Sequence, residues 1–222
     1  MKGDIVIVQA HHEKVASEIV PQIIKKIKEE NRIYTISVGG ESGCGKSEIS
    51  VAISNELNKY GIGAIILGQD DYFFLPPRRN SEKRHENPDW LGPHIEVNLD
   101  LLEKNLIEAI QGKSEICKPL IDYNEDVVET QTIDLRGIKV IIAEGTYTSL
   151  LRKIDTRIFI TRNWQQTLED RKRRNRGNEV YDPFTEKILA TEHKIIAGHR
   201  YLADFIVNDK YEVTNVESEQ LG

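Results

Sequence analysis

Residues 40–47 carry the clearest chemical signal in this sequence. They read Gly-Glu-Ser-Gly-Cys-Gly-Lys-Ser, which matches the phosphate-loop pattern G-x-x-x-x-G-K-[ST]. Glycines let several backbone N–H groups converge on phosphate oxygens, and the N-terminus of the helix that follows adds positive potential. In this pattern Lys46 contacts the β- and γ-phosphates, and the Ser47 hydroxyl ligates Mg²⁺. The motif therefore predicts ATP and Mg²⁺ as cofactors, with a nucleotide site formed by Gly40, Glu41, Ser42, Gly43, Cys44, Gly45, Lys46, Ser47 and Glu48.

Three carboxylates follow apolar stretches that read as buried strands. Asp70 and Asp71 come after residues 64–67, and Glu144 comes after residues 140–143. Ligands of open parallel sheets lie beyond the carboxyl ends of the strands, so these side chains should lie near the phosphate loop. Transfer of a phosphoryl group to an alcohol needs a base for the hydroxyl proton and an acidic group near Mg²⁺. We expect Asp70 to be the base and Ser47, Asp70 and Glu144 to hold the metal. Capping of loops and helices is the alternative explanation for these carboxylates.

A basic segment at residues 171–176, Arg-Lys-Arg-Arg-Asn-Arg, is the densest positive cluster in the chain. Guanidinium groups stay charged and bind phosphate oxygens in a fork, so the arginines of this segment are expected to contact phosphate groups. A basic lid closing over a triphosphate would also exclude water. A solvated helix face, with i,i+4 pairs to Glu169 and Asp170, is the alternative.

The composition excludes several classes of function. The 222 residues carry a net charge of −6, so no general attraction to nucleic acid or to an anionic membrane is expected. The apolar run at residues 5–8 is too short for a signal peptide core or a membrane span. Cys44 and Cys117 have no metal-ligand spacing, and reduced thiols fit a reducing compartment. We expect a cytoplasmic protein with a small-molecule partner, and the sequence leaves a homo-oligomer open.

Strands alternate with helices along the chain. The predicted strands cover residues 5–8, 33–38, 64–67, 140–143, 156–161 and 205–207, and the predicted helices cover residues 12–30, 45–60, 99–110, 165–174 and 183–197. Several of the strands are apolar at every position, which favours a mainly parallel sheet covered on both faces. We expect one three-layer α/β domain of the P-loop NTPase type over residues 1–222.

Three segments elaborate this predicted domain. Residues 1–32 form an N-terminal strand and a helix that Pro21 should kink or divide. Residues 70–134 form an acceptor-binding insertion, and residues 163–180 form the lid. Within the insertion, residues 76–93 read as a long surface segment and residues 118–134 as a hairpin or irregular insertion. The last residues, from 214 on, read as a polar tail.

Together these features resemble the uridine kinase and phosphoribulokinase family of P-loop small-molecule kinases. The resemblance covers residues 33–207 and depends on the order and spacing of four motifs, which are residues 39–47, Gln69-Asp70-Asp71-Tyr72-Phe73, Ile142-Ala143-Glu144-Gly145 and the arginine-rich stretch ending Arg176-Gly177. It implies an ATP-dependent kinase whose acceptor is a hydroxyl of a small molecule. By the resemblance, the catalytic residues are Lys46, Asp70, Arg171 and Arg176. The expected substrate-binding residues are Asp71, Tyr72, Arg84, Trp90 and Tyr123.

The acceptor-binding segment departs from the nucleoside-specific members of that family. Ile121 stands where they carry a tyrosine, and acidic residues around Asp126 stand where a base-contacting histidine is expected. The sequence therefore predicts that uridine and cytidine are poor substrates. Two alternatives stay open. One is a nucleoside monophosphate kinase that uses Arg78, Arg79 and Arg84, and the other is a nucleotide-regulated binding module without acceptor chemistry.

Overall fold

A six-stranded sheet forms the centre of the computed structural model, which describes residues 2, 6–168 and 183–216. The strand order is β2-β5-β1-β6-β7-β8. The strands are β1 (Tyr34–Gly40), β2 (Gly63–Gly68), β5 (Ile138–Gly145), β6 (Thr156–Ile160), β7 (Phe205–Val207) and β8 (Val213–Asn215). All neighbours pair in parallel except β8, which is antiparallel to β7. The predicted mainly parallel sheet is therefore confirmed.

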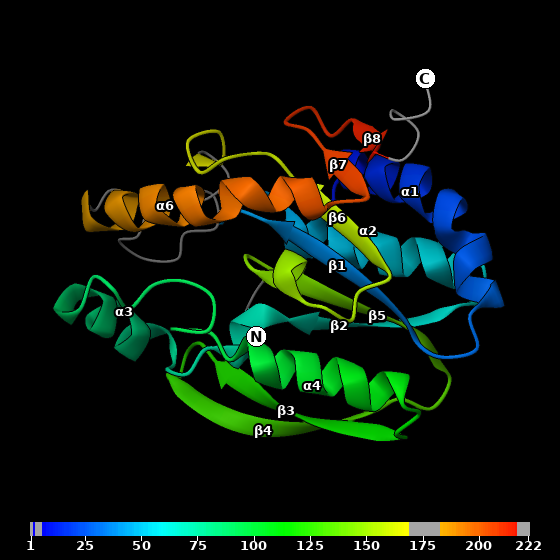
Figure 1. Ribbon diagram of the computed structural model, residues 1–222, viewed down its shortest axis with the longest axis horizontal. Coiled ribbons are helices and arrows are strands. Elements are labelled where there is room, and N and C mark those ends of the chain that lie inside the picture. The colour runs from blue at the N-terminus through cyan, green and yellow to red at the C-terminus, as the bar shows by residue number, and fades with distance from the viewer. Residues whose placement is uncertain (1, 3–5, 169–182, 217–222) are drawn as a thin grey trace.

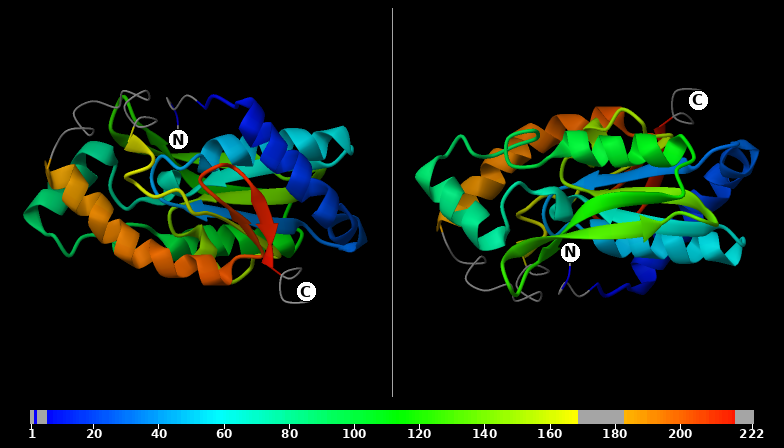
Figure 2. Two further views of the ribbon diagram at one scale, coloured as in Figure 1. Left: turned by 90° about the horizontal axis from the view of Figure 1, so that it is seen from above. Right: turned by 90° about the horizontal axis from the view of Figure 1, so that it is seen from below.

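Helices cover both faces of this sheet (Figures 1 and 2). On one face, α1 (Ala10–Glu29) and α2 (Lys46–Lys59) pack over a core that contains Val140 and Ile142. On the other face, α4 (Leu99–Ile110) and the end of α6 (Pro183–Ile196) pack over a core that contains Ile141 and Ala143. Alternate side chains of β5 thus enter opposite cores, as expected for a strand buried on both faces. The three-layer prediction is confirmed. Within the described part of the chain, no helix is long and apolar enough to cross a membrane.

Helix α1 is an integral part of one core. Its apolar stripe includes Val15, Ile19 and Ile23, which are all buried. Of the two outcomes expected of Pro21, a kink or a division, the division does not occur, because the helix continues from Ala10 to Glu29. Residues 6–9 form no strand, and Val6 and Ile7 are 38% and 64% exposed, so the predicted strand at residues 5–8 is not formed by its described part. At the other end of the chain, β8 takes up residues that were expected to begin a polar tail.

Residues 76–93, expected to be a long surface segment, contain the helix α3 (Pro77–Glu86). Pro77 suits the first helical position, because its missing N–H would have no helical partner there. The backbone N–H of Arg78 donates to Asp126 Oδ1 at 2.7 Å, so the helix receives its N-terminal cap from a turn 48 positions away. A cap supplied by a distant residue leaves no local pattern, which explains why the helix was not predicted.

A separate hairpin is formed by β3 (Glu115–Asp122) and β4 (Val127–Asp134), which confirms the hairpin expected around residues 118–134. A buried ion pair attaches it to the short turn η1 (Gln69–Tyr72) that follows β2. Lys118 Nζ lies 2.5 Å from Asp71 Oδ2, and the backbone N–H of Ile121 donates to Asp71 Oδ1 at 3.0 Å. Both carboxylate oxygens of Asp71 therefore bind the hairpin.

The ion pair predicts a large loss of stability when one partner is removed. Lys118→Met leaves the buried Asp71 carboxylate without its cation, and breaking such a pair typically costs about 3 to 5 kcal/mol of unfolding free energy. Urea denaturation measures this loss. Lys113→Met is the matched control, because Lys113 pairs with Glu108 at the surface and such pairs contribute at most about 1 kcal/mol. Equal losses in the two variants would contradict the anchoring role of Lys118.

Candidate active site

The phosphate loop connects the carboxyl end of β1 to the first turn of α2. Gly45 adopts a φ of 101°, a left-handed conformation that other residues rarely take, and α2 begins at the next residue. Lys46 Nζ donates to the backbone oxygen of Glu41 at 2.8 Å, so the lysine side chain folds back over the loop. The loop thus presents an ammonium group and a helix N-terminus to the same space, which is the arrangement that binds phosphate.

The predicted metal-binding carboxylate lies next to this loop because three parallel strands end together. Glu144 on β5 pairs in register with Val38 on β1 and with Gly68 on β2. Ser47 Oγ donates to Glu144 Oε1 at 3.3 Å. Burial, and then the charge of Asp70, raise the pKa of Glu144 to about 7. The structure therefore brings Ser47, Asp70 and Glu144 together at one edge of the sheet.

These residues fit a magnesium ion shared with a nucleotide. Mg²⁺ is usually held by one or two carboxylates together with substrate phosphates and water, and only rarely by a cage of protein ligands. No group of three or more His, Cys, Asp or Glu residues in the described chain forms such a cage. A cation beside Glu144 would favour its ionised form and oppose the repulsion from Asp70. The donor set is thus incomplete without phosphate oxygens, as the predicted function requires.

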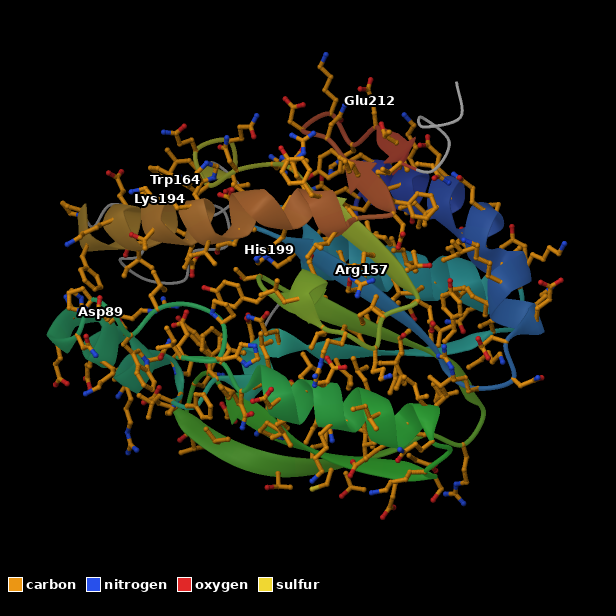
Figure 3. All side chains as sticks on the ribbon, in the orientation of Figure 1. Asp89, Arg157, Trp164, Lys194, His199 and Glu212 are labelled. Carbon is orange, nitrogen blue, oxygen red and sulfur yellow. The ribbon has the colours of Figure 1, made fainter. Side chains whose placement is uncertain are left out.

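Three residues that the sequence did not point to fasten the phosphate loop to the region of the predicted lid. The backbone N–H of Trp164 donates to Glu41 Oε2 at 2.7 Å, and His193 Nδ1 lies 2.6 Å from Glu41 Oε1. Thr167 Oγ1 donates to the backbone oxygen of Ser42 at 3.0 Å. Figure 3 shows Trp164 and, beside His193 in sequence, Lys194 in the region of α6. Arg171 and Arg176 lie outside the described residues, so their lid role stays a prediction.

The rings of His11, His12 and Tyr211 form an aromatic group next to Gly45, at the end of the phosphate loop. The sequence did not point to this group. A Cβ atom placed on Gly45 would lie 3.4 Å from His12 Nε2 and 3.5 Å from the Tyr211 hydroxyl. The His11 and Tyr211 rings are 4.0 Å apart, and Arg162 lies over the Tyr211 ring at 5.2 Å. Tyr211 has a φ of 60°, a conformation that costs a residue with a side chain about 1 to 3 kcal/mol and that clusters at functional sites.

Four of the five predicted substrate residues fall into two pairs. Arg84 and Trp90 belong to one cluster, in which Arg84 Nε donates to Glu96 at 2.8 Å and Trp90 Nε1 donates to Asn80 at 2.8 Å. By contrast, Asp71 is paired with Lys118 and the Tyr72 hydroxyl donates to Asn105 at 2.9 Å in the interior. These contacts favour supporting roles for Asp71 and Tyr72 over direct substrate contacts. Tyr123 is half-buried at the end of β3.

The aromatic group next to Gly45 predicts a contribution to nucleotide affinity. Stacking of a base on an aromatic ring is worth about 1 to 3 kcal/mol, so Tyr211→Ala should raise the Kd for ATP by about 5- to 150-fold. Isothermal titration calorimetry measures this directly. The control is Tyr201→Ala, because Tyr201 is 85% exposed and lies on the turn η4 (Ala197–Leu202). An unchanged Kd in Tyr211→Ala would show that the ring does not contact the bound nucleotide.

Comparison with known proteins points in the same direction as this geometry. The chain is 28% identical over 189 residues to a bifunctional α-galactosidase/sucrose kinase of Mediterraneibacter gnavus, covering 80% of this chain and 20% of that protein. It is 27% identical over 194 residues to a uridine kinase of Ligilactobacillus salivarius, covering 80% of this chain and 86% of that protein. The D-glycerate 3-kinase structure from Cryptococcus neoformans var. grubii superposes with a TM-score of 0.61 at 15% identity, over 93% of this chain and 99% of that one, which supports the fold.

The family assignment comes from a longer pattern than the phosphate loop alone. The model of the phosphoribulokinase/uridine kinase family matches residues 35–177, a span that begins in β1, contains the phosphate loop and passes Glu144. Helix α1, which supplies His11 and His12 next to Gly45, precedes this span. With the phosphate loop, the carboxylates and the sheet order in agreement, the chain belongs to the phosphoribulokinase/uridine kinase family.

Proposed function

We propose that this protein transfers the γ-phosphoryl group of ATP to a hydroxyl group of a small molecule. The observation that carries the proposal is the meeting of Lys46, Ser47, Glu144 and Asp70 at the carboxyl edge of β1, β2 and β5. A phosphate-binding loop alone would serve any nucleotide-binding protein. The additional carboxylate of Asp70, half-buried and without a hydrogen bond among the described residues, supplies the base that an alcohol acceptor needs.

In the proposed reaction the acceptor oxygen attacks the γ-phosphorus as the bond to the β–γ bridging oxygen breaks, giving a phosphomonoester and ADP. Asp70 aligns the acceptor hydroxyl and takes up its proton. Lys46 turns from the backbone oxygen of Glu41 to the β- and γ-phosphates, and Ser47 and Glu144 would hold Mg²⁺. The bound metal supplies positive charge to the phosphate oxygens. Arg171 and Arg176 are proposed to stabilise the transferred group from the lid.

Two relatives suggest candidate acceptors for this chain. By their names, one phosphorylates sucrose and the other uridine, and both compounds are uncharged and rich in hydroxyl groups. We propose that uridine and cytidine are poor acceptors. Ile121 is buried with its N–H bonded to Asp71, and the Asp126 carboxylate caps α3, so the two positions expected to contact a base are engaged within the protein.

One of the three arginines named for the monophosphate kinase alternative is engaged within the protein. That activity would need arginines free to bind the phosphate of an acceptor nucleotide. Arg84 instead lies against two carboxylates, with Nη2 at 2.6 Å from Glu96 Oε2 and at 3.6 Å from Glu192 Oε1. The alternative of a binding module without chemistry gives no role to Asp70.

Replacement of Asp70 tests the proposed chemistry. Asp70→Asn keeps the shape of the side chain but removes its basicity, so kcat should fall by about 10²-fold or more while the Kd for ATP changes little. Asp71→Asn should lower the melting temperature through loss of the Lys118 pair, with a smaller effect on kcat of the folded protein. Asp100→Asn, on the exposed side of α4, is the control. A coupled ADP-release assay gives kcat, and a greater loss in Asp71→Asn would show that the base was assigned to the wrong aspartate.

A further inference from the structure

A buried polar cluster lies between α3 and α6, beside the proposed phosphoryl-transfer site. We call it the Glu96 cluster, and it consists of Asn80, Arg84, Glu96, Tyr147 and Glu192. The two helices are held together by the stacked rings of His85 and Phe184, whose centroids are 3.5 Å apart. Figures 1 and 2 show α3 and α6 at the same end of the molecule. The cluster thus joins the acceptor-binding insertion to the helix that follows the predicted lid.

Glu96 has all the partners that its buried carboxylate needs. Its side chain is fully buried. Oε2 accepts from Arg84 Nε at 2.8 Å and from Asn80 Nδ2 at 3.2 Å. Oε1 lies 3.3 Å from the backbone N–H of Gly92 and 3.4 Å from the Tyr147 hydroxyl. Glu96 is therefore a structural anchor that holds the Arg84 guanidinium in place.

Glu192 is different because, among the described residues, no donor lies within hydrogen-bond distance of its carboxylate. The residue is only 8% exposed, yet its one described polar contact is Arg84 Nη2 at 3.6 Å, beyond hydrogen-bond distance. Neither oxygen of Glu192 is among the described side-chain atoms that are cut off from solvent without a partner, so both stay accessible. Donation from a ligand that enters the site would satisfy the carboxylate.

Glu192 also lies within reach of the reacting groups. Its neighbour in sequence, His193, contacts Glu41 of the phosphate loop at 2.6 Å. The charges of Lys46 and Asp70 both act on Glu192, and burial is the main cause that raises its pKa to about 7. On the other side, Glu192 faces Arg84 of α3. It thus lies between the phosphate loop and the insertion expected to hold the acceptor.

We propose that Glu192 accepts a hydrogen bond from a hydroxyl of the acceptor, and that the acceptor is an uncharged polyhydroxylated molecule, a saccharide or a polyol. This inference rests on the proposed kinase function. Glu96 and Glu192 place two carboxylates beside the Arg84 guanidinium, and the charge of Asp70 also acts on Glu192, so a phosphate or carboxylate on the acceptor would be repelled. Hydroxyl groups, which donate to carboxylates, are favoured instead.

Trp90 supports a carbohydrate-like acceptor over a more polar one. Its indole N–H donates to Asn80 Oδ1 at 2.8 Å, which ties the ring to the Glu96 cluster, while the ring itself is half-buried. A large aromatic face offers apolar contact area, and its polar edge is already satisfied. The C–H face of a sugar ring matches such a surface, with its hydroxyl groups directed to the carboxylates. An aromatic surface combined with a few well-placed polar groups is typical of small-molecule sites.

The test compares acceptors of the two charge classes in wild-type protein. ADP release is measured with ATP and Mg²⁺ in the presence of sucrose, fructose or sorbitol, and of fructose 6-phosphate or D-glycerate. We expect at least one uncharged compound to give a higher kcat/KM than either anion. Faster turnover of an anion would overturn the inference and leave the kinase function intact. Absence of acceptor-dependent turnover with all five compounds would also overturn the inference, whereas the kinase function with a different alcohol is tested separately by Asp70→Asn.

Glu192→Gln then tests the residue itself with an isosteric side chain. We expect kcat/KM for the preferred uncharged acceptor to fall by about 10- to 150-fold, the loss typical of one hydrogen bond to a charged group. The KM for ATP and the melting temperature should stay at their wild-type values. This result would separate a role in acceptor binding from a structural role. Glu186→Gln, on the exposed face of the same helix, is the control. Equal kcat/KM values in the two variants would overturn the assignment of Glu192.

Discussion

The rest of this site depends on one constraint, the close approach of two half-buried carboxylates, Asp70 and Glu144, at one edge of the sheet. Asp70 and Glu144 lie there because β2 and β5 are adjacent, parallel and in register. Their repulsion and the burial of Glu144 favour a proton or a cation at this edge, which raises the pKa of Glu144 to about 7. Lys46, Ser47 and the N-terminus of α2 supply compensating donors and positive charge from the next strand. The same arrangement that is costly without ligands is therefore suited to a metal-bound triphosphate.

Contacts between residues far apart in the sequence attach the predicted acceptor-binding insertion, residues 70–134, to that edge of the sheet. Asp71 attaches the β3–β4 hairpin to the turn that carries Asp70, and Asp126 of the hairpin caps α3. Helix α3 in turn presents Arg84 to Glu96 and Glu192, and α6 reaches the phosphate loop through His193 and Glu41. These contacts form one continuous chain from the turn that carries Asp70 to the phosphate loop.

Much of this organisation follows from local patterns in the sequence. The phosphate loop, the strand after which Glu144 lies, and the amphipathic helix Leu99–Ile110 each have a periodicity or motif that requires no knowledge of distant residues. Helix α3 was missed because its cap comes from Asp126, and the roles of His193 and Tyr211 were missed because they depend on residues more than 150 positions away. Likewise, the sequence predicts a substrate contact for Asp71, whereas its buried pair with Lys118 gives it a structural role that no local pattern indicates. In these cases contacts between residues far apart in the sequence, rather than local helix or strand propensity, determine the structure and the role of each residue.

The central claim is that the phosphoryl group leaves ATP for an alcohol and not for water. Phosphorus-31 NMR of the wild-type protein with ATP, Mg²⁺ and an uncharged polyhydroxylated acceptor tests it most directly. The account predicts a new phosphomonoester resonance that grows in equal amount to ADP, coupled to the proton on the carbon that carries the phosphorylated oxygen. ADP accompanied only by inorganic phosphate, with every acceptor supplied, would contradict it and identify the protein as a nucleotide hydrolase.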